Sequence, residues 1–112
     1  MESFWRDHRG VYQMIIEPVS GVSGELKVPS SKSYTHRVLF LGLLCDGITT
    51  FEDPLICDDT RYTLEAVRSL GAEADWTGVE SDGYVKGGEV YAGESGTTAR
   101  IALAIASLAE GR

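Results

Sequence analysis

Apolar residues spaced for helices alternate along this chain with short runs typical of strands. The first helical run is apolar on most faces, which indicates a helix packed on two sides, and Asp46-Gly47 is predicted to end it. In the second run Leu64, Val67 and Leu70 recur every third residue until Gly71, which suits a helix end. The helices are predicted at 33–45, 58–70 and 101–109.

Strands are predicted where β-branched and aromatic residues cluster between turn residues. The predicted strands are 14–18, 24–28, 48–52, 72–77, 83–86 and 89–92. Trp76 and Tyr84 are expected to pair across two of them. Residues 1–13 are charged and are expected to form a poorly ordered or disordered leader ahead of the domain at 14–112. The alternation of strands and helices predicts an α/β (α+β) fold.

The composition narrows the class of protein. The 112 residues amount to about one small domain, and the net charge of −7 disfavours binding to nucleic acid or to an anionic membrane. Cys45 and Cys57 have no metal-ligand spacing, and the absence of a signal-like or membrane-spanning apolar run predicts a cytoplasmic location. Asp58 and Asp59 are interpreted as acids that stabilise a helix start, with a functional carboxylate pair as the alternative.

The polar segment 28–37, VPSSKSYTHR, holds the first candidate chemistry. Pro29 should end the preceding strand, and the serines after it are suitable helix N-caps. The N–H groups of a helix start carry partial positive charge and suit a phosphate or a carboxylate. Lys32 adds a charge, and Arg37, one turn after Ser33, can hold an anion with two hydrogen bonds. An ordinary solvated helix cap is the alternative for the same residues.

A second polar segment, 93–100, repeats this arrangement. Both segments pass from a predicted strand through hydroxyl residues to Thr, one further residue, Arg and an apolar helix, and Arg37 and Arg100 lie 63 positions apart. Gly96 would allow another group to approach the backbone closely. The repeat predicts β-α-β-α-β-β units, one complete and a second begun. The helix at 101–109 would then lack partners, as in a fragment of a larger fold.

Segments 24–37 and 93–100 resemble two signatures of the 5-enolpyruvylshikimate-3-phosphate synthase family. Between them, Asp58-Asp59-Thr60-Arg61 and Leu70-Gly71 are similar to family landmarks in the same order. The resemblance covers 14–112 and implies the amino-terminal part of an enolpyruvyl transferase, an inside-out α/β barrel of two domains built from such units. It also implies that the strand at 14–18 belongs to the distal domain of the full enzyme.

The implied reaction transfers the carboxyvinyl group of phosphoenolpyruvate to the 5-hydroxyl of shikimate 3-phosphate, by addition and elimination, without a metal or organic cofactor. The resemblance implies that Lys32 contacts both substrates and that Ser33 and Arg37 bind shikimate 3-phosphate. It implies that Gly96 and Thr97 bind phosphoenolpyruvate. The family's catalytic acid and base lie in later units, so no catalytic residue is expected here and the chain alone should be inactive.

The resemblance also concerns two further residues. Arg100 is implied as support for its helix start, and Glu94 stands where many family members have Asn. The rest of the enzyme is the partner needed for activity, and the isolated chain is expected to self-associate. One alternative is the related enolpyruvyl transferase that acts on a UDP-linked amino sugar, which Ser33 disfavours because that relative usually has Asn there. The other is a non-catalytic anion-binding or structural module.

Overall fold

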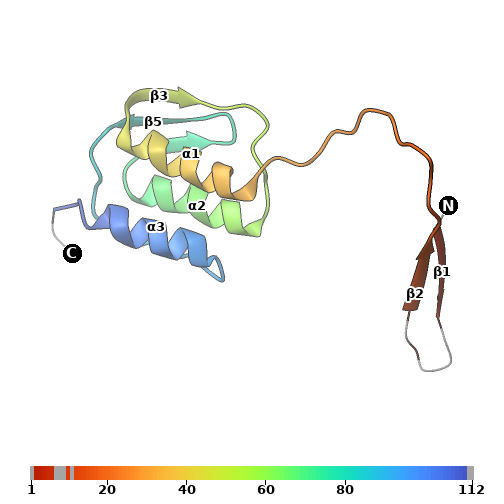
Figure 1. Ribbon diagram of the computed structural model, residues 1–112. Helices are drawn as coiled ribbons and strands as arrows, with labels where there is room; N and C mark the ends of the chain where they lie inside the picture. The colour runs from red at the N-terminus through yellow and green to blue at the C-terminus, as the bar shows by residue number, and fades with distance from the viewer. Residues whose placement is uncertain (1, 7–9, 11, 111–112) are drawn as a thin grey trace.

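The computed structural model describes residues 2–6, 10 and 12–110, which form a mixed α/β chain (Figure 1). The elements in order are β1 (Glu2–Arg6), β2 (Tyr12–Ile16), α1 (Lys32–Leu44), β3 (Asp46–Thr50), α2 (Asp58–Ser69), β4 (Glu73–Asp75), β5 (Gly78–Asp82) and α3 (Gly96–Ala106). The predicted mixed class is confirmed. From α1 onward the order of elements is α-β-α-β-β-α, and the β-α-β-α-β-β repeat units and the inside-out barrel stay a prediction.

The body of the chain is built in layers. Strands β3, β5 and β4 form an antiparallel sheet in that order. Helices α1 and α2 pack on one face of the sheet, and α3 packs on α1 and α2 beyond them (Figure 1). Helix α1 therefore contacts the sheet on one side and the other two helices on another, as its apolar sequence predicted, although Leu41 remains exposed.

The core lies between the sheet and the first two helices. The apolar residues that these elements bury there include Leu39, Phe40, Leu43, Leu64, Val67, Leu70 and Val79. Gly42 lets α1 approach β5, because a Cβ at this position would lie only 2.6 Å from Cβ of Val79. The helix end was predicted wrongly, since Cys45 is the C-cap and Asp46 already begins β3. The chain therefore passes from helix to strand without a separate turn.

Three of the predicted strands are wrong. Segments 24–28 and 89–92 are irregular, and no strand of the described residues pairs with either of them. A strand requires a hydrogen-bonded neighbour, so strand-like composition alone was not sufficient. The predicted strand at 83–86 is also wrong, because the second strand of the hairpin is Gly78–Asp82. The turn comes earlier than expected, at residues 76–77, between β4 and β5.

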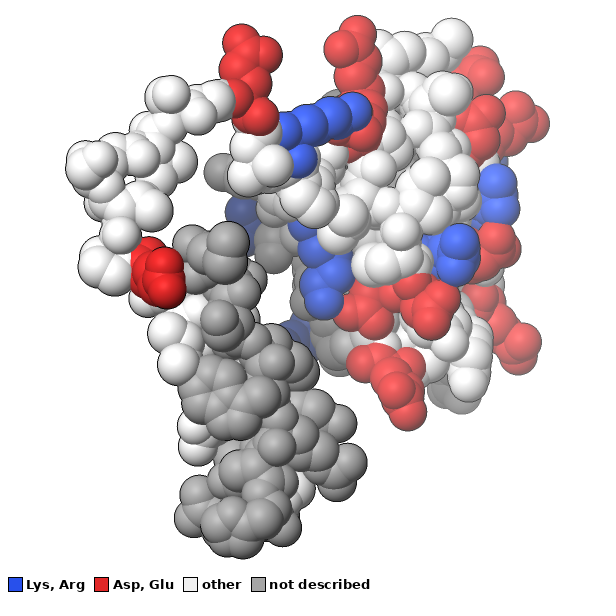
Figure 2. Space-filling model, turned by 90° about the vertical axis from the view of Figure 1, so that its right-hand side faces the viewer, with Lys and Arg blue, Asp and Glu red and all other residues white. Residues whose placement is uncertain are grey.

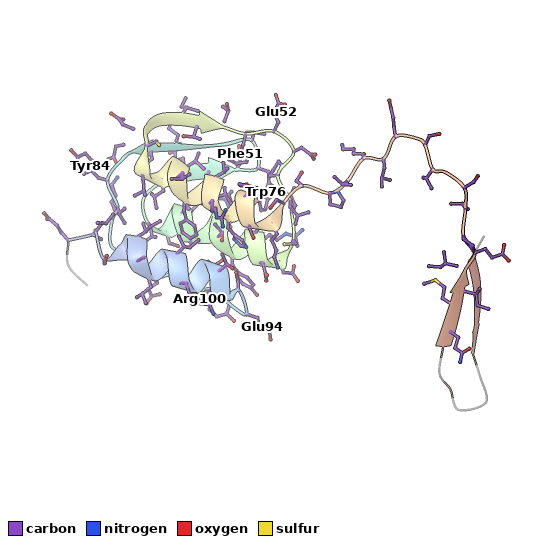
Figure 3. All side chains as sticks on the ribbon, viewed as in Figure 1. Phe51, Glu52, Trp76, Tyr84, Glu94 and Arg100 are labelled. Carbon is purple, nitrogen blue, oxygen red and sulfur yellow. The ribbon has the colours of Figure 1, made fainter. Side chains whose placement is uncertain are left out.

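The side chain of Asp75 explains this early turn. Its Oδ1 accepts hydrogen bonds from the Thr77 and Gly78 amides, at 2.8 and 3.2 Å, and from the Thr77 hydroxyl, at 2.5 Å. Such local bonds allow an acid to form a tight turn without a glycine-rich loop. The predicted pairing of Trp76 with Tyr84 is therefore wrong: Trp76 follows β4, whereas Tyr84 lies beyond the far end of β5 and is exposed (Figure 3).

The first two strands form a hairpin of their own. Strand β1 pairs antiparallel with β2, with Glu2 opposite Ile16, where the sequence predicted a poorly ordered leader over 1–13. Phe4 and Trp5 are residues that favour strands, and the poor order of the leader stays a prediction. Residues 1, 7–9 and 11 of that predicted leader lie outside the described residues. An extended, exposed segment joins the hairpin to α1 (Figure 1).

Candidate functional site

The N-terminal ends of α1, α2 and α3 lie at one end of the molecule, because all three helices run in the same direction (Figure 1). We call this end the helix-start face and define it by residues 31–37, 57–61 and 94–100. Figure 2 views the molecule from this end, with Lys and Arg side chains next to Asp and Glu side chains. Parallel helix starts add their partial positive charges, which makes this face suited to anions despite the negative net charge.

Helices α1 and α3 begin with the same hydrogen-bonding arrangement. Ser31 Oγ accepts from the Tyr34 amide, at 3.2 Å, and Ser31 O accepts from the Thr35 amide, at 3.1 Å. In α3, Ser95 takes the same two roles toward Thr98 and Ala99. Both helix starts therefore have the same capped geometry.

Each cap leaves two neighbouring amides unbonded among the described residues. They belong to Lys32 and Ser33 in α1 and to Gly96 and Thr97 in α3. These are the positions that the sequence singled out for substrate binding. Unbonded amides at a helix start are the groups that commonly bind phosphates.

The caps also correct the predicted internal repeat. Ser31 and Ser95 are 64 positions apart, whereas Arg37 and Arg100 are 63 apart. Arg37 therefore lies six residues after its cap and Arg100 five after its own. One residue corresponds to about 100° around a helix. The two arginines point in different directions from their helices and are not structural equivalents.

Lys32 is held by an acid from the neighbouring helix. Its Nζ donates to Oδ2 of Asp59 at 3.0 Å, and both side chains are partly exposed. This hydrogen bond and the attraction of the carboxylate raise the pKa of Lys32, so its ammonium group stays charged. The sequence favoured a capping role for Asp59. No local spacing could have revealed the contact, because the two residues are 27 positions apart and meet only through the packing of α1 on α2.

The other predicted residues of α1 lie on the same face. Ser33 is exposed in the first turn, and Arg37 is exposed one turn further along. The guanidinium carbon of Arg37 lies 5.6 Å from the ring centroid of Tyr34, a cation–π distance that restricts the arginine while leaving its N–H groups accessible. The structure therefore brings Lys32, Ser33 and Arg37 together at the start of one helix.

The predicted residues of α3 are exposed as well. Nothing lies within 4 Å of the position that a Cβ on Gly96 would take, so the backbone there is open to a ligand. Thr97, Glu94 and Arg100 are exposed, and Figure 3 shows Glu94 and Arg100 on the side of α3 that faces away from α1. Arg100 is therefore placed less favourably than Gly96 and Thr97 for a ligand shared with α1.

A buried network of hydrogen-bonded polar side chains behind this face was not foreseen from the sequence. His36 Nδ1 lies 2.6 Å from Thr63 Oγ1, which lies 2.6 Å from Thr98 Oγ1, which lies 2.7 Å from Ser95 Oγ. All four side chains are buried. Burial lowers the pKa of His36, opposed by the carboxylate of Asp59. The threonines gave no signal because isolated hydroxyl residues in a helix are common.

Comparison with known proteins identifies the family. The model of the EPSP synthase family, described as 3-phosphoshikimate 1-carboxyvinyltransferase, matches residues 16–112. The chain belongs to the EPSP synthase family.

Several similar proteins carry the name 3-phosphoshikimate 1-carboxyvinyltransferase. A 3-phosphoshikimate 1-carboxyvinyltransferase of Thermococcus kodakarensis is 56% identical over 93 residues, which are 83% of this chain and 23% of that protein. The protein of the same name from Pyrococcus abyssi is 48% identical over 99 residues, 88% of this chain and 24% of its own. One from Halobacterium salinarum is 42% identical over 99 residues, 82% of this chain and 23% of its own. The chain thus spans about a quarter of the length of these relatives.

Two other features are absent from the part of this EPSP synthase family member that the structure describes. Within residues 2–6, 10 and 12–110, no group of three or more His, Cys, Asp or Glu side chains is arranged to hold a metal ion. In the same part of the chain, none of the helices has the length and apolar character needed to cross a bilayer.

Proposed function

We propose that this chain is the amino-terminal part of an enzyme that transfers the carboxyvinyl group of phosphoenolpyruvate to the 5-hydroxyl of shikimate 3-phosphate. In this proposal the chain supplies part of the substrate-binding site. One observation carries it: the two capped helix starts leave unbonded amides at Lys32–Ser33 and at Gly96–Thr97, the positions expected from the family signatures. Family membership supports the reaction class.

Lys32, Ser33 and Arg37 bind shikimate 3-phosphate in this proposal, and Lys32, Gly96 and Thr97 bind phosphoenolpyruvate. The two substrates together carry two phosphates and a carboxylate, which require several donors and cations. Ser33 and Arg37 offer a hydroxyl and a planar guanidinium from one helix. Gly96 offers an open backbone at the start of another. The partly exposed ammonium of Lys32, at the start of α1, lies beside Asp59 of α2.

Asp59 has a supporting role in this proposal. Donors that are already oriented before the substrates arrive stabilise developing charge without reorganising during the reaction. The 3.0 Å ion pair holds the Lys32 ammonium on the helix-start face and keeps it protonated, because the pKa of Lys32 is raised by this contact. Asp59 would thus orient Lys32 without contacting the reacting atoms.

The remaining parts of the proposal concern the whole enzyme. The acid that protonates the alkene carbon and the base that activates the hydroxyl come from the rest of the protein. Segment 14–112 belongs to the enolpyruvyl transferase fold, and the strand at 14–18 joins the distal domain. The enzyme works in the cytoplasm on the shikimate pathway to aromatic amino acids, without a metal or organic cofactor.

The test uses a full-length chimaera, in which this chain replaces the matching part of the Thermococcus kodakarensis relative. We expect the chimaera to release phosphate from phosphoenolpyruvate only when shikimate 3-phosphate is present. Lys32→Ala and Arg37→Ala should each lower kcat/KM at least about a hundredfold, because each removes a charged contact to a substrate. Circular dichroism should show an unchanged fold, since both side chains are exposed.

Lys86→Ala is the matched control for Lys32→Ala. Lys86 is also a partly exposed lysine, paired with Asp82 at 3.6 Å, but it follows β5 and lies outside the helix-start face. We expect its kcat/KM to equal that of the unmodified chimaera. Near-normal activity in both Lys32→Ala and Arg37→Ala would contradict the residue assignment, and a folded chimaera that does not turn over the substrates would contradict the proposed reaction.

A further inference from the structure

The buried hydrogen-bond network of hydroxyl and imidazole groups joins all three helices behind the helix-start face. His36 comes from α1, Thr63 from α2, and Thr98 from α3, with Ser95 as the cap of α3. The fractional exposures of the first three side chains are 1%, 0% and 0%. Thr63 is the central member, because it is the residue through which α1 and α3 are hydrogen-bonded to each other.

The hydrogen bonds of this network have a preferred direction of donation, from His36 toward Ser95. His36 Nε2 is buried and has no hydrogen-bond partner among the described residues. A buried N–H without an acceptor is less tolerable than a lone pair without a donor, so the proton belongs on Nδ1. Nδ1–H then donates to Thr63, and the Thr63 hydroxyl donates to Thr98. The Thr98 hydroxyl in turn donates to Ser95 Oγ, at 2.7 Å, or to Asp59 O, at 3.3 Å.

Two members of this hydrogen-bond network are sequence neighbours of predicted substrate contacts. His36 directly precedes Arg37, and Thr98 directly follows Thr97. The predicted substrate contacts are exposed on the helix-start face, while the side chains of the hydrogen-bond network are buried in the interior. Apolar packing between helices is not directional and permits small shifts, whereas hydrogen bonds of 2.6 Å fix both distance and orientation.

We propose that Thr63 is a positioning residue, whose hydroxyl fixes the first turn of α3 against α1 and thereby sets the spacing between the two substrate subsites. This inference rests on the proposed function and deepens it. Thr63 itself touches neither subsite, since its side chain is fully buried. A shift of α3 by a fraction of an ångström would leave binding to α1 intact and misplace the group bound at Gly96–Thr97.

The test compares Thr63→Val and Thr63→Ser in the full-length chimaera. Valine keeps the shape and removes the hydroxyl, while serine restores the hydroxyl. We expect Thr63→Val to lower kcat/KM for phosphoenolpyruvate about tenfold or more, because small misplacements of bound reactants have effects of this size. The Kd of shikimate 3-phosphate alone should stay unchanged, because Ser33 and Arg37 lie on one helix. The ¹⁵N signal of His36 Nδ1 should shift in Thr63→Val and return in Thr63→Ser.

Ser81→Ala is the control for loss of a buried hydroxyl. Ser81 Oγ donates to Leu43 O at 2.6 Å, at the opposite end of α1. We expect this variant to lose stability without a change in kcat/KM for phosphoenolpyruvate. Thr63→Val with unchanged kcat/KM, or with equal losses in both substrates, would overturn the inference, as would a Thr63→Ser variant that fails to restore activity. Failure of the proposed function is seen separately, as absence of turnover in the unmodified chimaera.

Discussion

At the scale of single residues, two glycines of this chain have opposite environments. A Cβ on Gly42, inside α1, would lie 2.6 Å from Cβ of Val79 in the core, whereas a Cβ on Gly96 would meet nothing within 4 Å. Packing therefore requires the first glycine and not the second. The absence of a packing reason at Gly96 is consistent with the proposal that a substrate approaches its backbone.

Gly42→Ala should therefore change the stability of the fold, whereas Gly96→Ala should change substrate binding. Overpacking at Gly42 destabilises by about 1–3 kcal/mol, which outweighs a gain of up to about 1 kcal/mol from the better helix former. Gly96→Ala should leave the free energy of unfolding unchanged within about 0.5 kcal/mol, but it should raise KM for phosphoenolpyruvate in the chimaera. Urea unfolding and steady-state kinetics measure both. A destabilised Gly96→Ala with normal KM would contradict this interpretation.

His36 should make the stability of the fold depend on pH. Burial lowers its pKa below the ordinary 6.5, while Asp59 raises it and Lys32 lowers it further. Well above pH 6.5 the imidazole is neutral in both states and contributes no pH dependence. As the pH falls below 6.5, the unfolded chain takes up a proton that the folded chain does not, so stability is lost down to the folded pKa.

The variant His36→Gln tests this pH dependence, because glutamine can bond Thr63 but does not titrate. Thermal unfolding from pH 7.5 to 5 should show a fall in Tm for the unmodified chain that is shallower in His36→Gln. The groups that titrate elsewhere are common to both proteins and cancel in the difference. Equal slopes in the two proteins would show that His36 is not the group responsible.

At the scale of elements, the small sheet carries like charges on facing strands. Glu80 of β5 lies opposite Glu73 of β4, and Asp82 of β5 lies opposite Asp46 of β3. These side chains are exposed on the face of the sheet that α1 and α2 do not cover. Facing like charges destabilise a sheet, so the inner face, with Val79 and Ser81 buried, must hold it together.

Glu80→Thr should therefore stabilise the sheet. The substitution removes the repulsion and introduces a residue that favours strands, a gain of about 0.2–1 kcal/mol. The gain should shrink in concentrated salt, which screens exposed charges. Glu25→Thr is the control, since Glu25 is exposed in the extended segment outside the sheet. Chemical unfolding that shows no gain for Glu80→Thr over Glu25→Thr would contradict the repulsion.

The helices were more predictable than the strands for a physical reason. A helix satisfies its hydrogen bonds internally, so the spacing of Leu64, Val67 and Leu70 was sufficient to locate α2. A strand depends on a neighbour that can be distant in sequence. Segments 24–28 and 89–92 have strand-like composition but no paired neighbour among the described residues, and both were predicted wrongly.

The candidate site divides in the same way. Lys32, Ser33 and Gly96 could be singled out from local sequence, because cap and glycine signals lie within a few residues of them. Asp59 and Thr63 could not, because their contacts join positions 27 and 35 apart and exist only once the helices have packed. Whether these residues bind substrates stays a prediction.

At the scale of the whole molecule, the chain combines one polar end with apolar surface elsewhere. Leu103 of α3 and Leu108, just after α3, are 77% and 66% exposed, and Ile48 on the open face of the sheet is 71% exposed. Burying each would be worth about 1.5–3 kcal/mol. Because the chain spans about a quarter of its relatives' length, we expect the isolated chain to self-associate, a prediction that sedimentation at several concentrations would test.

The central claim is that this chain supplies adjoining subsites at the starts of α1 and α3. The most direct measurement is a two-dimensional amide NMR spectrum of the chimaera, isotope-labelled only in this chain, with each substrate added separately. We expect shikimate 3-phosphate to shift the Ser33 and Arg37 amides and phosphoenolpyruvate to shift those of Gly96 and Thr97. The Gly83 amide, which bonds Ser81 at the opposite end of α1, should stay in place. Saturating substrates that leave all four amides unmoved would contradict the account.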